Sequence, residues 1–148
     1  GPIAAVLVTN SDHIRNAESL SQKLGLPIYA PAGEKDTFPI KAHKWLKEGD
    51  RLAPELFVLE MEGSKTKGEL ALLLEKTTLI TGDLIRSHAE GTLTLLPDNT
   101  LLDKAKAIES VKRLAALPDL QTVIVGDGWP VFQNALPALA ALLKEQGQ

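Results

Sequence analysis

The sequence predicts an α/β fold in which helices flank a mixed β-sheet. At each end of the chain an apolar run is followed by an amphipathic stretch, an order typical of parallel β-α-β units. The middle of the chain instead holds three strand-like runs, 55–61, 69–75 and 77–81, with no helical segment between them. Because their connections are short, these strands are expected to pair as antiparallel neighbours. We expect residues 1–148 to form one domain.

The N-terminal residues predict the first β-α-β unit. Residues 3–9 (IAAVLVT) are apolar and rich in branched side chains, which indicates a buried strand. Asn10 or Ser11 is expected to cap a helix that ends at Gly25. Residues 27–30 then predict the second strand.

The remaining segments complete the predicted fold. Residues 31–52 predict a connection with a short helix around 43–46. Residues 101–117 predict an amphipathic helix and 122–125 a strand, and Asn134 is expected to begin the last helix. One stripe of the first of these helices is apolar, formed by Leu101, Ala105, Ile108, Val111 and Ala115.

Composition excludes several classes of protein. The chain of 148 residues has a formal net charge of -3, and its basic residues are scattered, which argues against nucleic-acid binding. It has no cysteine, so neither disulfides nor thiolate metal sites can form. No apolar run approaches the roughly 18 residues that a membrane span requires. We expect a cytoplasmic protein that does not bind membranes.

Four short segments at predicted strand ends are candidates for a functional site. They are Asn10–His13, Ser64–Gly68, Thr81–Asp83 and Gly126–Gly128, and α/β proteins commonly assemble sites at strand ends. Taken singly, each has an ordinary explanation: an acid at a helix start, an exposed histidine, or an aspartate in a turn. Their combination in this order is more informative than any one of them.

In this order the segments resemble the metallo-β-lactamase superfamily, which includes glyoxalase II-type thioester hydrolases. Members carry the motifs THxHxDH, PGHTPG, TGD and GHG at the ends of successive structural elements. The corresponding stretches here are VTNSDHIRN (8–16), EGSKTKGELALLLE (62–75), TTLITGDLI (77–85) and VIVGDGWPV (123–131). The resemblance covers nearly the whole chain and implies an αβ/βα sandwich.

The resemblance also implies two metal sites, and the first of them has lost its ligands in this sequence. Family members hold the first metal with both histidines of HxH and the histidine of the PGHTPG turn. Here the shortened stretch Asn10-Ser11 precedes Asp12, and Lys65 stands where the turn histidine would be. We therefore expect a degenerate member without dinuclear zinc hydrolase activity.

The second metal site is partly retained. Asp12, His13 and Asp83 match three of its four ligands, and Asp127 stands where the family has the histidine of GHG. A single divalent ion on these four residues would suit magnesium, manganese or iron better than zinc. That possibility defines our alternative, a mononuclear hydrolase of a small ester, thioester or phosphoester.

Our preferred hypothesis is a metal-free site. Two carboxylates about 4 Å apart repel by roughly 4 kcal/mol at an effective dielectric near 20. The Lys65 ammonium is expected to relieve this repulsion in place of a cation, with Arg15 or Arg86 as other candidates. Such a site would be structural or would bind a small molecule, and the protein would serve as a binding or interaction module. The opposing interpretation is that these side chains face solvent separately.

Two further side chains are candidates for the edge of a pocket. His88, placed in the loop after Asp83, could contact a ligand, although an exposed loop histidine is the favoured explanation. Trp129 could form a pocket wall or pack in the core.

The resemblance implies several strands before the first motif, which this sequence does not show. Either the sequence is a fragment or the expected fold is reduced, and missing strands would expose strand edges and apolar faces. A homodimer or a covering partner is accordingly expected, and a compact monomer in sedimentation would count against it. A flavodoxin- or receiver-like fold is a third alternative, which antiparallel pairing within 55–81 would exclude.

Overall fold

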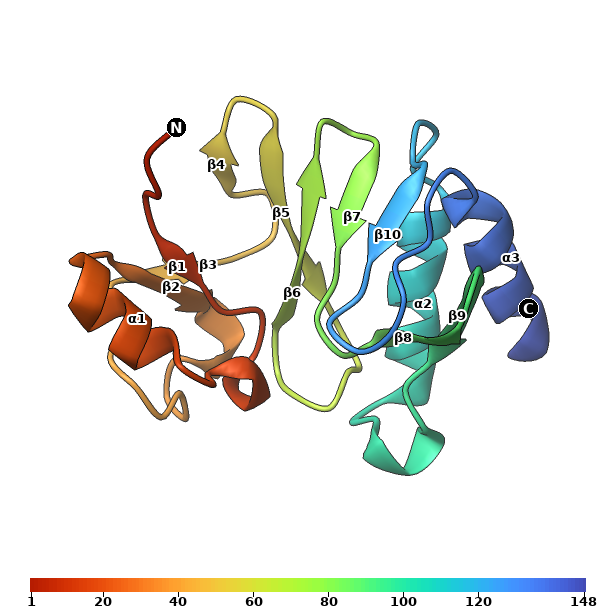
Figure 1. Ribbon diagram of the computed structural model, residues 1–148. Coiled ribbons are helices and arrows are strands. Elements are labelled where there is room, and N and C mark those ends of the chain that lie inside the picture. The colour runs from red at the N-terminus through yellow and green to blue at the C-terminus, as the bar shows by residue number, and fades with distance from the viewer.

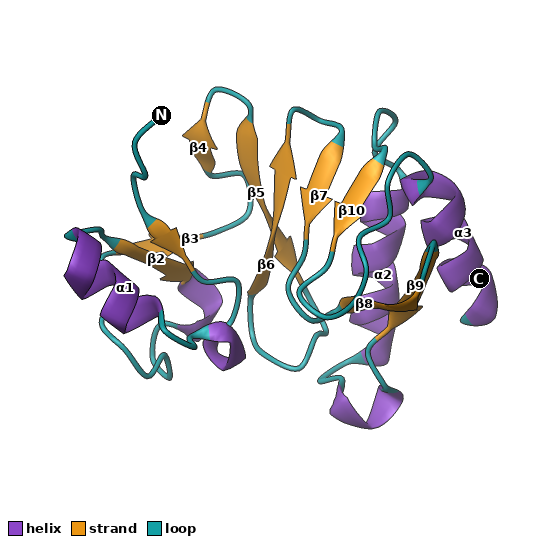
Figure 2. Cartoon of the chain, in the orientation of Figure 1, coloured by secondary structure: helices purple, strands orange, loops and turns teal.

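Two β-sheets face each other at the centre of the molecule, and helices cover the outer side of each (Figures 1 and 2). This computed structural model describes all residues, 1–148. One helix, α1, lies outside the first sheet, while α2 and α3 lie outside the second. The four layers form the αβ/βα sandwich that the resemblance implies. None of the helices combines the length and apolar character that crossing a membrane requires.

The first sheet is parallel and has the order β1-β2-β3. Its elements, with the connecting helix and two 3₁₀ turns, are β1 (Val6–Leu7), a turn (Ser11–His13), α1 (Ala17–Leu24), β2 (Ile28–Pro31), a turn (Ala32–Glu34) and β3 (Lys44–Leu46). The predicted β-α-β unit is present.

Two local predictions in this region are wrong. Asn10 caps only a 3₁₀ turn, and the α-helix begins later because Arg15 adopts a left-handed backbone (φ 43°) that interrupts it. The short helix expected around 43–46 is instead strand β3, which pairs with β2. Leu46 is completely buried in the apolar cluster between the sheets, and this tertiary contact favours the extended strand.

The second sheet has the order β10-β7-β6-β5-β4. Its strands are β4 (Arg51–Ala53), β5 (Leu56–Met61), β6 (Glu69–Leu74), β7 (Thr78–Ile80) and β10 (Thr122–Ile124). The antiparallel pairing of β5, β6 and β7 is as predicted and excludes a flavodoxin- or receiver-like sheet, while β10 is parallel to β7.

The C-terminal half contains α2 (Lys104–Ala115), α3 (Ala135–Glu145) and a hairpin that the sequence did not predict. The hairpin strands are β8 (Ile85–Ala89) and β9 (Thr92–Leu95). Both helices are as expected, but the buried face of α2 differs from the predicted stripe. Ala105 is exposed, and the buried apolar side chains are Ala107, Ile108, Val111 and Leu114.

Strand β6 explains why the middle of the chain is so apolar. Ala71 and Leu73 point into the core beneath α2 and α3, whereas Leu70 and Leu72 point into the cluster between the sheets. A strand buried on both faces has no polar face, so its sequence is a continuous apolar run.

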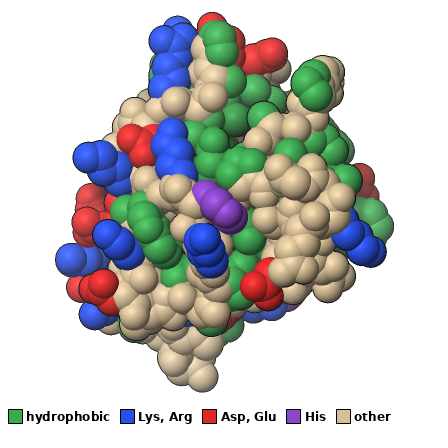
Figure 3. All heavy atoms as spheres, turned by 90° about the vertical axis from the view of Figure 1, so that its left-hand side faces the viewer, with side chains coloured by type: hydrophobic (Ala, Val, Ile, Leu, Met, Phe, Trp, Pro, Cys, Tyr) green, Lys and Arg blue, Asp and Glu red, His purple; other side chains and the backbone are tan.

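An apolar cavity of about 340 Å³ opens between the two sheets. Its walls come from the N-terminal segment and strands β1, β2, β4, β5 and β6, through Ala4, Ala5, Leu7, Tyr29, Leu52, Ala53, Leu56 and Leu72. Figure 3, which looks from the side of the first sheet, shows apolar side chains reaching the surface among basic ones. The expected homodimer stays a prediction, and this apolar surface is the candidate for its interface.

The link between α2 and the second sheet can be tested at Ser110. Its buried hydroxyl accepts from the Glu62 amide (2.9 Å) and donates to the Glu62 carbonyl (3.0 Å). We expect S110A to lower the free energy of unfolding by about 1–3 kcal/mol, because both backbone groups lose their partner. The exposed S19A control should change it by less than about 0.5 kcal/mol. Urea unfolding measures both, and equal effects would contradict the prediction.

Candidate functional site

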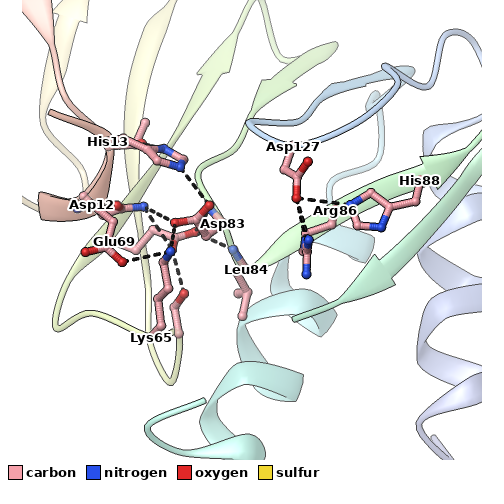
Figure 4. A network of polar contacts seen from close by, with 12 residues as sticks. Asp12, His13, Lys65, Glu69, Asp83, Leu84, Arg86, His88 and Asp127 are labelled. Atoms are coloured by element: carbon pink, nitrogen blue, oxygen red, sulfur yellow. Dashed lines mark hydrogen bonds and ion pairs between the residues drawn. The ribbon is translucent and has the colours of Figure 1, made fainter. Parts of the chain in front are cut away.

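The site lies at one edge of both sheets. Strand β6 is antiparallel to β7, so its first residue lies at the same edge as the residues that follow β7. The chain after β1 reaches the same place, where the Leu70 amide donates to the Thr9 carbonyl (2.8 Å). Three segments far apart in the sequence therefore present their polar side chains to one another (Figure 4).

At the centre of the site an ammonium group lies between two carboxylates. Lys65 Nζ is 2.8 Å from Asp12 Oδ2 and 2.8 Å from Asp83 Oδ2. On the other side of Asp83, His13 Nε2 lies 2.8 Å from Oδ1. The geometry thus brings together four of the predicted site residues, Asp12, His13, Lys65 and Asp83 (Figure 4).

These contacts shift the acid–base properties of both partners. Burial alone would raise the pKa of Asp83, but the hydrogen bonds and charges of His13 and Lys65 hold this pKa well below its ordinary value. Burial lowers the pKa of Lys65, yet its contacts with Asp12 and Asp83 outweigh that effect and the net shift is upward. The pair is therefore held in its charged form.

A completely buried glutamate, Glu69, holds the backbone at Asp83 in place. Glu69 Oε1 accepts from the backbone amides of Asp83 (2.9 Å) and Leu84 (2.8 Å), and Oε2 accepts from the Ser64 hydroxyl (2.6 Å). Burial raises the pKa of Glu69, against the opposing effect of these hydrogen bonds. Glu69 fixes the backbone that carries Asp83.

Asn10 has a similar supporting role. Its buried amide donates to Asp83 Oδ2 (3.1 Å), and its Oδ1 accepts from the Asp12 amide (3.0 Å). Sequence reasoning included Asn10 in a candidate segment and as a helix cap but gave it no role at the site, and it overlooked Glu69. The available signal was a glutamate at the start of the otherwise apolar run ELALLL, because a charge within a fully buried strand requires buried partners.

Asp127 and His88 belong to a second, separate cluster. Asp127 Oδ2 accepts from Arg86 Nε (2.9 Å) and Nη2 (2.6 Å) and lies 3.1 Å from His88 Nε2. The hydrogen bonds from His88 and Arg86 lower the pKa of Asp127. His88 lies on strand β8, not in a loop as expected. Because Arg86 and His88 are two residues apart on that strand, both reach the same carboxylate.

The glycine before Asp127 nevertheless approaches the first cluster. A Cβ on Gly126 would lie 2.9 Å from His13 Cε1, so only glycine allows this approach. The Asp127 carboxylate points to Arg86 and His88 (Figure 4). The other two candidates take no part: Arg15 is exposed on the backbone turn before α1, and Trp129 is 65% exposed, which is contrary to a role in core packing.

The donor groups do not fit the metals that the resemblance implies. No group of three histidine or acidic side chains is arranged to hold a metal ion. Of the four residues considered for a single metal, Asp127 is engaged by Arg86, and the Lys65 ammonium lies between Asp12 and Asp83. A bound cation would have to displace that ammonium.

The ion cluster makes stability depend on pH. Since the pKa of Asp83 is lower in the folded chain, the unfolded chain binds more protons in acid, and this contribution to stability is present near neutral pH and lost as pH falls below about 4. We expect D83N to reduce the free energy of unfolding near neutral pH by about 1–3 kcal/mol. The difference from the unmodified chain should shrink in acid.

The exposed pair of Asp98 and Lys104 (2.6 Å) supplies the control for this comparison. D98N should cost less than about 1 kcal/mol at every pH, because solvent screens the pair. Urea unfolding as a function of pH measures both variants. A D83N difference that is independent of pH would refute the role given to this carboxylate.

The fold is shared with solved metallo-β-lactamase structures. The metallo-beta-lactamase from Pontibacter korlensis has a TM-score of 0.74 at 17% identity, with 98% of this chain and 71% of that chain covered. FIM-1 from Pseudomonas aeruginosa, in a mono-zinc form, has a TM-score of 0.74 at 20% identity, with 98% and 68% covered. TTHA1623, in a di-iron-bound form, has a TM-score of 0.74 at 24% identity, with 95% and 76% covered.

Sequence comparison leads to the same group of proteins. No curated protein sequence matches the chain. The profile of the metallo-beta-lactamase superfamily, however, matches residues 1–145. With nearly its whole length matched by this profile and its layers arranged as in the solved structures, the chain belongs to the metallo-β-lactamase superfamily.

Proposed function

We propose that this protein is a small-molecule-binding or interaction module, without dinuclear zinc hydrolase activity, in which a lysine takes the place of a metal ion. The observation that carries the proposal is the position of Lys65 Nζ, 2.8 Å from both Asp12 and Asp83. The ammonium supplies the positive charge that two adjacent carboxylates require.

An ammonium cannot replace the chemistry of a metal ion. Metal-dependent hydrolysis uses a bound cation to generate hydroxide at neutral pH and to polarise the substrate carbonyl. Lys65 has no open coordination position for water, and its three N–H groups act only as hydrogen-bond donors. Two of them face Asp12 and Asp83, which leaves one for a ligand. This favours binding over hydrolysis.

The mononuclear hydrolase is the weaker alternative. It requires Asp127 to leave Arg86 and His88, and it requires Lys65 to leave two carboxylates at once. A bound cation would have to compete with the covalently attached ammonium of Lys65 for Asp12 and Asp83, and with Arg86 for Asp127. The rearrangement therefore opposes metal binding.

Metal analysis and a lysine variant test the proposal together. We expect protein purified without chelator to hold zinc, manganese and iron only at substoichiometric levels, and added Zn²⁺ to leave its Tm unchanged. In K65M the carboxylates of Asp12 and Asp83 lose their counter-ion, so Zn²⁺ should raise the Tm of this variant. K106M, which removes an exposed lysine paired with Glu62 (3.5 Å), is the matched control and should behave like the unmodified chain.

Two results would overturn the proposal. One is stoichiometric metal in the unmodified protein that is lost on D83A substitution. The other is metal-dependent hydrolysis of a small thioester or phosphoester by the unmodified chain. Elemental analysis and a chromogenic ester assay distinguish these outcomes from a metal-free site.

A further inference from the structure

A polar cavity of about 290 Å³ lies beside Lys65. It is bordered by the loop that follows β2 and by the loop that precedes β6. Seven residues from four segments line it: Ser11, Glu34, Thr37, Lys65, Thr66, Lys67 and Leu102. Six of the seven side chains are charged or carry a hydroxyl. A volume near 300 Å³ is at the lower limit for small-molecule sites, so an occupant would be small and polar.

Glu34 contributes a buried carboxylate oxygen without a partner. Its side chain is only 3% exposed, and Oε2 accepts from the Ser11 amide (2.8 Å). Oε1 is buried and has no hydrogen-bond partner. The Thr66 hydroxyl in the same cavity is likewise unpaired. A buried charged acceptor is costly unless a donor reaches it, so this oxygen points to a donor group supplied from outside the chain.

Two lysines bring positive charge to the same cavity. Lys67 is exposed and belongs to none of the ion pairs of the molecule. Lys65 has one N–H beyond those that face Asp12 and Asp83. These free donors match an anionic group, whereas Glu34 matches a cationic or neutral donor.

The two walls of the cavity are held against each other. A Cβ on Gly33, beside Glu34, would lie 2.7 Å from the Lys67 carbonyl oxygen and 3.0 Å from Gly68 Cα. The backbones on the two sides are therefore in direct contact, which keeps the loop of Glu34 beside the loop of Lys67.

We propose that this cavity binds a small zwitterion, a molecule with an amino group and a carboxylate. The amino group lies against the nearly buried carboxylate of Glu34 and reaches Oε1 when that side chain turns toward the cavity. The carboxylate of the ligand accepts from Lys67 and from the remaining N–H of Lys65. This inference rests on the proposed binding function and assigns its ligand class. It requires no metal and no covalent step.

Titration of ¹⁵N-labelled protein with γ-aminobutyrate, butyrate and butylamine tests the ligand class. We expect γ-aminobutyrate to shift the amide signals of Ser11, Thr37 and Thr66. Each single-charge analogue should bind at least about tenfold more weakly, since losing one charge-assisted contact of about 1.4 kcal/mol corresponds to that factor. Equal binding of butyrate, or no shift with any of the three compounds, would overturn the proposal.

Conservative variants test the Glu34 end and the Lys67 end of the proposed site separately. E34Q keeps an oxygen for the Ser11 amide but turns an N–H₂ group toward the ligand, so it should lose the preference for γ-aminobutyrate over butyrate. K67M should weaken γ-aminobutyrate and butyrate alike. K144M, at the end of α3, is the control and should leave binding unchanged.

If neither E34Q nor K67M changes binding, the zwitterion proposal fails. The proposed function is judged separately by the metal content of the unmodified chain and by the Zn²⁺ response of K65M. A negative titration with metal-free protein would therefore reject only the ligand class, whereas stoichiometric metal would reject the proposed function itself.

Discussion

The ammonium of Lys65 between Asp12 and Asp83 is the interaction on which the site depends. It connects the chain after β1, the loop before β6 and the chain after β7, which come from both sheets. Without it, two carboxylates would meet at the edge of the sandwich and repel each other by several kcal/mol at the dielectric of a protein surface. A covalently attached cation has one further property: unlike a metal ion, it cannot dissociate.

The pKa values of two carboxyl groups in this site are shifted in opposite directions. Basic neighbours lower the pKa of Asp83, whereas burial raises the pKa of Glu69. In an enzyme such a divergence often marks a general base and a general acid. Here Glu69 is completely buried, and its oxygens are occupied by two backbone amides and a hydroxyl, so it has no access to a substrate. The opposite pKa shifts therefore reflect a structural role, in which buried Glu69 holds the backbone that carries the charged Asp83.

Much of the fold, and the grouping of Asp12, His13, Lys65 and Asp83, could be predicted from the sequence. Short connections between apolar runs predicted the antiparallel strands, and motif order placed Lys65 with Asp12 and Asp83. Asp127 was misplaced because its direction depends on β8, whose sequence IRSHA contains no long apolar run to reveal a strand. Strand β3 was mistaken for a helix because only tertiary contacts favour its extended form, namely the pairing with β2 and the burial of Leu46 between the sheets.

In the proposed function, the lysine that takes the place of a metal ion sets ligand binding against metal chemistry. A metal ion exchanges ligands, so it can hold a water molecule and a substrate in turn. Lys65 instead directs two of its three N–H groups to the carboxylates of Asp12 and Asp83, and these contacts hold its loop in place. That loop continues into Lys67 and Gly68, which form one wall of the cavity opposite Glu34. The ion cluster and the cavity therefore share a segment, and in our proposals the ammonium of Lys65 replaces a cation in the cluster and contributes to the anion contact in the cavity.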